Sequence, residues 1–197
     1  MPKNAHRGAG LSRRDVLIGA ATTALVAASP PLLAAGSKIS RATAAATLDS
    51  MPAGRYMAAA TALSDGRILV TGGYASPPQP GLLVVPSSSG YILNPGSGAW
   101  TVVASMNLGR ARHAAVALPD GRVAVIGGIS GSQPTSSVEI FDPSSNTWSY
   151  SAPLAQARFD HSAVASAGSV YVIGGAGESM ICSVELLSVN SSNSINY

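Results

Sequence analysis

RARHAAVALPDGRVAVIGG, residues 110–128, decides the fold, because this stretch recurs twice elsewhere in the chain. The other copies are RYMAAATALSDGRILVTGG at residues 55–73 and RFDHSAVASAGSVYVIGG at residues 158–175. Each copy begins with arginine, continues through a run of small residues, and ends on an apolar run closed by a glycine doublet. Self-similarity at a spacing of about 20 to 50 residues is typical of repeat architectures. The sequence therefore predicts successive copies of one supersecondary unit.

Each copy has the pattern of a β-hairpin. The first strands are expected at residues 58–63, 114–118 and 162–165, and the second at 68–71, 123–126 and 170–173. Asp65-Gly66 and Asp120-Gly121 separate the two runs, and glycine allows the positive φ that a two-residue turn requires. Ala167-Gly168 takes this place in the third copy with one residue fewer, so a different turn is expected there. The small residues of the first strands suit strands that converge on a common axis.

The sequence after each glycine doublet is also repeated. Leu93-Asn94-Pro95 followed by Trp100 matches Phe141-Asp142-Pro143 followed by Trp148. In the third copy, residues 183–186 (SVEL) repeat residues 137–140 (SVEI), but no tryptophan follows. We expect each tryptophan on the outermost strand of its unit, where a large flat side chain can pack against a neighbouring unit.

These elements, recurring in one order, resemble the kelch repeat, especially the bacterial form akin to the central domain of galactose oxidase. The resemblance covers residues 51 to about 188. It implies an all-β, kelch-type β-propeller of about three four-stranded blades, the last incomplete. The expected organisation is a leader at residues 1–36, a linker at 37–50, kelch repeats at 51–190 and a polar tail at 191–197.

The first 36 residues have the layout of a secretory signal: a basic start, an apolar stretch and small residues near its end. Residues 12–17 (SRRDVL) resemble the twin-arginine motif through Arg13 and Arg14, although Val16 stands where that motif prefers phenylalanine. An ordinary secretory leader is the alternative. Proline breaks the apolar run at Pro30, so the run is too short to span a membrane. We expect an exported bacterial protein, periplasmic or extracellular, with no membrane span after leader removal.

The charge distribution argues against a nucleic-acid partner. The net charge is +3, but from Ser37 onward eight basic residues balance eight acidic ones, without a basic cluster. Only 11% of residues are charged and 46% are hydrophobic. Propellers usually have about 4 to 8 blades, each covered by the next. About three blades should leave two apolar faces open, which predicts self-association or pairing with another repeat-bearing chain.

Few residues are candidates for chemistry. His113 and His161 hold equivalent positions, each three residues after an arginine, Arg110 or Arg158. These four residues are inner-strand binding candidates for an anion or a metal, and the alternative is that they tie one blade to the next by hydrogen bonds. Cys182, the single cysteine, lies in an apolar run where a small buried side chain is expected. No catalytic residue, metal ligand or cofactor is assigned.

The main functional hypothesis is a non-catalytic binding module for carbohydrate or protein partners. The residues between Gly73 and Tyr91 form an insertion that is a candidate binding loop, with an inert surface loop as the alternative. The second hypothesis is a fragment of a galactose-oxidase-like copper radical oxidase acting on carbohydrates or alcohols. No motif of this chain matches the residues that hold copper in that family, and one fold can serve many functions.

Overall fold

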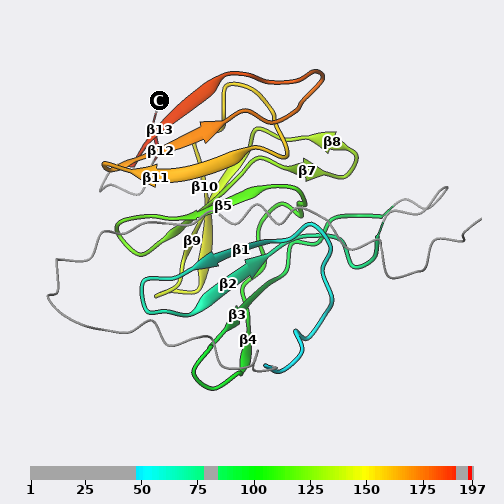
Figure 1. Cartoon of the computed structure of the whole chain (residues 1–197), viewed down its shortest axis with the longest axis vertical. Coiled ribbons are helices and arrows are strands. Elements are labelled where there is room, and N and C mark those ends of the chain that lie inside the picture. The colour runs from blue at the N-terminus through cyan, green and yellow to red at the C-terminus, as the bar shows by residue number, and fades with distance from the viewer. Residues whose placement is uncertain (1–47, 78–83, 190–194, 197) are drawn as a thin grey trace, which may run out of the picture.

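The computed structural model describes residues 48–77, 84–189 and 195–196. The expected leader, with Arg13 and Arg14, lies outside these residues, as does most of the expected linker. Every element of the described part is a β-strand. Figure 1 shows three four-stranded antiparallel sheets stacked one after another along the molecule. The all-β expectation is confirmed, and these sheets are consistent with kelch propeller blades.

Strand order within each sheet follows the chain, so each sheet is one blade. The first blade contains β1 (Ala59–Ala62), β2 (Ile68–Thr71), β3 (Gly90–Leu93) and β4 (Trp100–Val103). The second contains β5 (Ala114–Ala117), β6 (Val123–Ile126), β9 (Val138–Asp142) and β10 (Thr147–Ser151), with the small hairpin of β7 (Ile129–Ser130) and β8 (Gln133–Pro134) inserted after β6. The third contains β11 (Ser162–Ser166), β12 (Ser169–Ile173), β13 (Val184–Val189) and β14 (Ile195–Asn196).

The last blade is incomplete in the sense that its outer strand is very short. β14 has two residues, paired to β13 as Ser188 with Asn196 and Val189 with Ile195. It lies within the segment assigned from sequence to a polar tail. Its counterparts β4 and β10 have four and five residues.

The hairpins form where the Asp-Gly pairs predicted them, but the prediction of two-residue turns is wrong for the first two blades. The N–H of Leu63 donates to the carbonyl of Arg67, and the N–H of Gly66 donates back to the carbonyl of Leu63. This is a three-residue loop, in which a tight turn is followed by glycine at a φ of 86°. The second blade repeats these bonds around Gly121. The third has the two-residue turn instead, with both Ala167 and Gly168 at positive φ.

Two apolar cores lie between the blades. The core between the second and third blades has eleven buried members: Val116, Leu118, Ala124, Ile126, Val138, Ile140, Leu154, Ala163, Val170, Val172 and Leu187. The core between the first and second blades has seven: Leu63, Leu69, Ile92, Met106, Val123, Val125 and Phe141. The inner strands β1, β5 and β11 lie side by side, as their small side chains predicted (Figure 1). Burial against the next blade is therefore what stabilises each sheet.

The tryptophans lie on the outer strands, as expected. Trp148 packs against Phe141 with ring centroids 4.8 Å apart, and its Nε1–H donates to the carbonyl of Ala104 at 2.8 Å. Because Ala104 directly follows β4, this bond joins the second blade to the exit of the first. Trp100 makes the equivalent bond to the carbonyl of Asp49. Ring packing and one polar bond thus hold Trp148, and the equivalent polar bond holds Trp100.

The glycine doublets lie where adjacent blades come closest. Gly127 has a φ of 57°, and a Cβ placed on it would lie 2.6 Å from the carbonyl oxygen of Arg158 and 2.8 Å from Cε1 of His161. Its neighbour Gly128 has a φ of 99° and donates its N–H to the same carbonyl at 2.8 Å. The doublet therefore serves two needs, a left-handed backbone and space for the arginine-histidine segment of the next repeat.

Cys182 was expected to be buried, and this expectation is wrong. The thiol is free and exposed, in the connection Met180–Ser183 that leads into β13. Of the described residues, none belongs to a helix with the length and apolar character needed to cross a membrane.

Candidate functional site

Arg110, the first sequence candidate, is fully buried and its guanidinium is held on several sides. Nη1 donates to the carbonyls of Gly127 and Ser137, both at 2.9 Å, and Nη2 donates to Glu139 Oε1 at 2.6 Å. Burial lowers the pKa of Arg110, while the neighbouring carboxylate opposes this shift. All of these acceptors belong to the second blade, so the side chain anchors the start of its own repeat rather than bridging two blades.

Glu139 completes the anchor, and sequence analysis did not single it out. Its carboxylate is fully buried and accepts from the backbone N–H groups of Asn107 and Leu108 as well as from Arg110. Asn107 and Leu108 belong to the connection that enters the second blade. The recurrence of Ser-Val-Glu in the second and third repeats was the available signal, since a buried arginine requires a carboxylate or carbonyl partner.

Arg158 repeats the arrangement in the third blade. Its guanidinium donates to the carbonyls of Gly174 and Ser183 and forms an ion pair with Glu185. Glu185 in turn accepts from the backbone N–H of Ala155 at 2.7 Å. Two of the three repeats thus contain one and the same arginine–glutamate anchor.

The first repeat departs from this pattern. Tyr91 stands where the other repeats have glutamate, and Arg55 donates to its hydroxyl at 3.2 Å and to Ser89 Oγ at 2.7 Å. The guanidinium also lies over the Tyr91 ring, 5.6 Å from the centroid. Pro52 occupies the place of Asn107 and has no N–H to offer a carboxylate. Pro52 thus removes a backbone donor that a glutamate at position 91 would need, and the uncharged Tyr91 does not need that donor.

The two histidines are buried between blades but have different partners. His113 Nε2 lies 2.9 Å from Thr71 Oγ1 at the end of β2, which ties the second blade to the first. Burial, then the nearby charge of Arg110, lowers the pKa of His113 to about 3. At the place of Thr71, the second blade has Ile126, which offers His161 no side-chain hydroxyl and approaches its ring only through the backbone. Burial, followed by Arg158, lowers the pKa of His161 to about 4.

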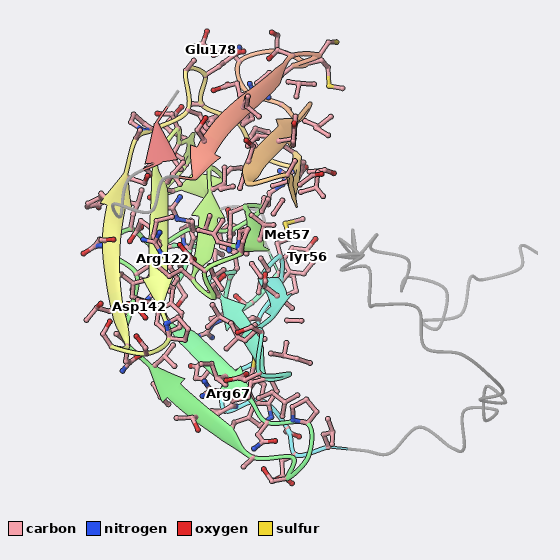
Figure 2. All side chains as sticks on the ribbon, turned by 90° about the vertical axis from the view of Figure 1, so that its left-hand side faces the viewer. Tyr56, Met57, Arg67, Arg122, Asp142 and Glu178 are labelled. Carbon is pink, nitrogen blue, oxygen red and sulfur yellow. The ribbon has the colours of Figure 1, made fainter. Side chains whose placement is uncertain are left out.

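A chain of backbone bonds runs across the three blades beside these histidines. The N–H of Arg112 donates to the carbonyl of Met57, and the N–H of Asp160 donates to the carbonyl of Arg112, both at 3.0 Å. All three residues have positive φ, between 53° and 57°. Although Asp160 directly precedes His161, its carboxylate pairs with Arg112 across the blades. Figure 2 shows Met57 and Tyr56 on one side of the fan of sheets, away from Arg122 and Asp142.

All four sequence candidates are thus buried, the two arginines bonded within their own blades and the two histidines between blades. Their polar groups face main-chain carbonyls, glutamates or the neighbouring blade, and not an open cavity. In the part of the chain that the structure describes, no three or more His, Cys, Asp or Glu side chains gather in a way that could hold a metal ion.

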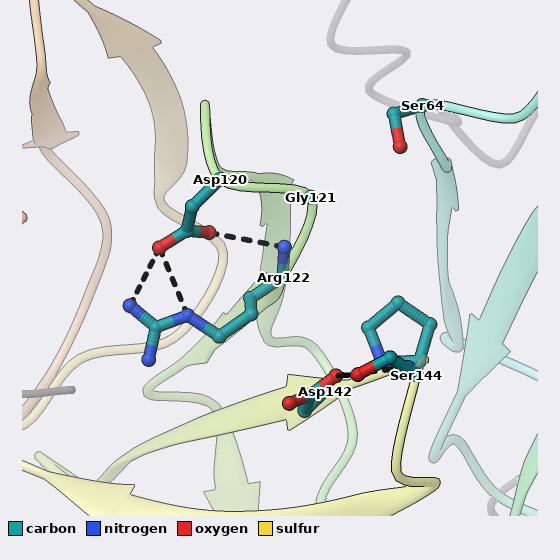
Figure 3. Close-up of a pocket in the computed structure, with 7 residues that line it drawn as sticks. Ser64, Asp120, Gly121, Arg122, Asp142 and Ser144 are labelled. Atoms are coloured by element: carbon teal, nitrogen blue, oxygen red, sulfur yellow. Dashed lines mark hydrogen bonds and ion pairs between the residues drawn. The ribbon is translucent and has the colours of Figure 1, made fainter. Parts of the chain in front are cut away.

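A hollow of about 330 Å³ lies elsewhere, among the hairpin loops of the first two blades. Its lining consists of Ser64, Asp120, Gly121, Arg122, Asp142, Pro143 and Ser144. Figure 3 shows Asp120 bound to Arg122 on one side and Asp142 beside Ser144 on another. Sequence analysis marked Asp120-Gly121 as a turn and Asp142-Pro143 as part of a repeated segment, but it did not predict that the two segments meet.

The carboxylates of this hollow are ionised and already oriented. A hydrogen bond from the Arg122 side chain lowers the pKa of Asp120, and a hydrogen bond from the Ser144 hydroxyl lowers that of Asp142. Asp142 Oδ1 accepts from both the N–H and the hydroxyl of Ser144, at 2.8 and 2.6 Å. Hydrogen-bond acceptors and a guanidinium therefore share one rim between two blades.

Comparison with protein families agrees with the fold. The Kelch motif matches twice, at residues 55–107 and 110–155, together about half of the chain. The chain belongs to the kelch-repeat family. Kelch repeat domains are typically interaction modules. The third sheet, β11–β14, lies beyond the matched residues and repeats the same blade in the structure. No curated protein matches the chain.

Proposed function

We propose that this protein is an exported, non-catalytic binding module that recognises carbohydrate or protein partners through the hairpin-loop hollow of its first two blades. The observation that carries the proposal is the convergence of Ser64, Arg122 and Asp142 from three separate loops onto one open hollow. Loops on a rigid scaffold are where propellers and other β folds usually place recognition. The buried arginines and histidines supply that rigidity.

The chemistry of the rim suits a ligand rich in hydroxyl or amide groups. The ionised carboxylates of Asp120 and Asp142 accept hydrogen bonds, while serine hydroxyls both donate and accept. Sugar hydroxyls and the polar side chains of a protein surface offer the complementary groups. Side chains that are already hydrogen-bonded to one another need little reordering when a ligand binds, which favours affinity.

Binding measurements with the exported chain test the proposal. A glycan array and a cross-linking capture from envelope extracts would be run with the unchanged chain, with Asp142→Ala and with Arg122→Ala. The expected result is one specific ligand class that both substitutions weaken by about tenfold, which corresponds to about 1.4 kcal/mol. Asp65→Ala is the matched control, because Asp65 occupies the equivalent loop of the first blade but does not line the hollow. An affinity that neither substitution changes would overturn the proposed site.

A further inference from the structure

The face of the third blade that points away from the second is apolar and uncovered. Strand register places Val164, Tyr171 and Leu186 in one row across it, and Ile173 and Val184 in the next. Four of these side chains are exposed by 38 to 56%. A contiguous apolar face of this kind on a folded protein is typical of an interaction site. In Figure 1, this face closes the upper end of the stack at β11–β13.

The second blade shows what such a face binds. Its residues at the same repeat positions are at most 2% exposed, and they are Val116, Ala124, Ile126, Val138 and Ile140. The third blade covers them with Ala163, Val170, Val172 and Leu187, in one continuous core. The occupant that fits the open face is therefore another blade that offers small and branched apolar residues at those four positions.

The first blade of this chain offers such a surface at the other end of the stack. Ala60, Ile68 and Val70 hold the repeat positions of Ala163, Val170 and Val172. Ala60 is exposed, and Ile68 and Val70 are only half-buried, on the side of the sheet opposite the second blade. At these three positions the two ends of the molecule present the two halves of the same contact, whereas Leu93, at the place of Leu187, is already buried.

The backbone N–H and carbonyl groups of the two end blades are complementary as well. Between blades, the doublet N–H of Gly128 donates to the carbonyl of Arg158, and the N–H of Asp160 donates to the carbonyl of Arg112. Among the described residues, the N–H of Gly175 makes no equivalent bond, and its expected acceptor is the carbonyl at the place of Arg55 in a following repeat. Among the same residues, no backbone N–H donates to the Asp160 carbonyl, and its expected donor is the N–H at the place of Met57 in a following repeat.

We propose that two copies of this chain assemble head to tail, with the third blade of each covered by the first blade of the other. Gly175 N–H then meets the Arg55 carbonyl of the second copy, and the Met57 N–H of that copy meets the Asp160 carbonyl. Two such contacts close a two-fold ring, as heterologous contacts do when the rotation closes. The ring has six blades, within the range of about 4 to 8 that propellers use.

The first test measures the mass of the exported chain in solution, by light scattering and sedimentation at micromolar concentration. We expect two copies per particle. Val184→Lys or Leu186→Lys on the open face of the third blade, and independently Ala60→Lys on the first, should each give a folded monomer. The matched control is Tyr150→Lys, a 59% exposed aromatic residue on the outer strand β10 that belongs to neither end face. A monomeric unchanged chain, an open-ended polymer, or a dimer indifferent to all three end-face lysines would overturn the proposal.

Disulfide trapping tests the direction of the contact. In a Cys182→Ser background, chains carrying Ala60→Cys are mixed with chains carrying Val164→Cys and oxidised. Head-to-tail assembly predicts cross-linking between the two kinds of chain and little within either kind. Efficient cross-linking of Val164→Cys with itself would show that identical faces meet and would refute the arrangement. The assembly does not depend on the proposed ligand, so monomers that still bind it through Asp142 would refute the ring and leave the binding function standing.

Discussion

Glu139 accepts a 2.6 Å hydrogen bond from Arg110 at a place where neither side chain is exposed to solvent. The same carboxylate holds the backbone of Asn107 and Leu108, so the ion pair fixes the connection between the first two blades as well as the strand that carries it. A surface pair such as Arg112–Asp160 has no comparable hold on the backbone. This difference sets the expected cost of breaking each pair.

Glu139→Ala should lower the free energy of unfolding by about 3 to 5 kcal/mol, because it leaves a buried guanidinium without its counter-charge. Asp160→Asn breaks an exposed pair and should cost at most about 1 kcal/mol. Urea unfolding at pH 7 measures both. Equal costs for the two substitutions would show that the buried anchor has no special role.

Gly127→Ala should destabilise the chain more than Gly131→Ala, although both glycines have a φ near 60°. A left-handed backbone alone costs a non-glycine residue about 1 to 2 kcal/mol. At Gly131, an added Cβ meets nothing within 4 Å, whereas at Gly127 it would strike the Arg158 carbonyl and His161. Thermal melts of the two variants distinguish the cost of a left-handed backbone from the cost of a steric clash with the next blade. A larger loss at Gly131 would contradict the role assigned to the doublet.

Stability should fall as the pH drops from about 6.5 toward 4. The folded pKa values of His113 and His161, about 3 and about 4, lie below the ordinary value of 6.5, so the unfolded chain binds protons first. The histidines' contribution is complete above pH 6.5 and is lost on the way down, by up to about 1.4 kcal/mol per pH unit for each ring. Urea unfolding from pH 7 to 5.5 measures the slope while staying above the range in which most aspartates and glutamates titrate.

His113→Ala and His161→Ala should each flatten that slope while lowering thermal stability at pH 7. His113 loses its 2.9 Å bond to the Thr71 hydroxyl, so its replacement should cost more than that of His161, which has no such side-chain partner. A structural role predicts no loss of a specific activity in either variant. An unchanged slope, or a tightly bound metal that either substitution releases, would contradict it.

Replacing Arg13 and Arg14 with lysines should trap the chain inside the cell, because the twin-arginine route reads the adjacent arginines themselves. A reporter fused after residue 50 and fractionation of the cells measure the effect. The unchanged leader fused to the same reporter is the control. Equal export of both fusions would replace the twin-arginine route with the ordinary secretory one.

The amino-acid sequence by itself determined the repeat, the hairpins and the order of strands in each blade. Small residues, apolar runs and Asp-Gly pairs act over a few neighbouring positions, so a repeated pattern predicts a repeated unit without knowledge of distant contacts. It also placed Trp148 on an outer strand. It also indicated that the last blade is incomplete, in agreement with the short β14, but it did not reveal that Tyr91 takes the place of the anchoring glutamate in the first repeat.

Only the tertiary structure decided what each repeated residue contacts. His113 and His161 are equivalent in sequence, but the blade before each offers Thr71 to one and Ile126 to the other. Glu139 is the partner of Arg110 across 29 positions, and Cys182 is exposed although it lies in an apolar run. The physical reason is that hydrogen bonding and burial depend on side chains that are distant in the sequence, within the same blade for Arg110 and in the neighbouring blade for the two histidines.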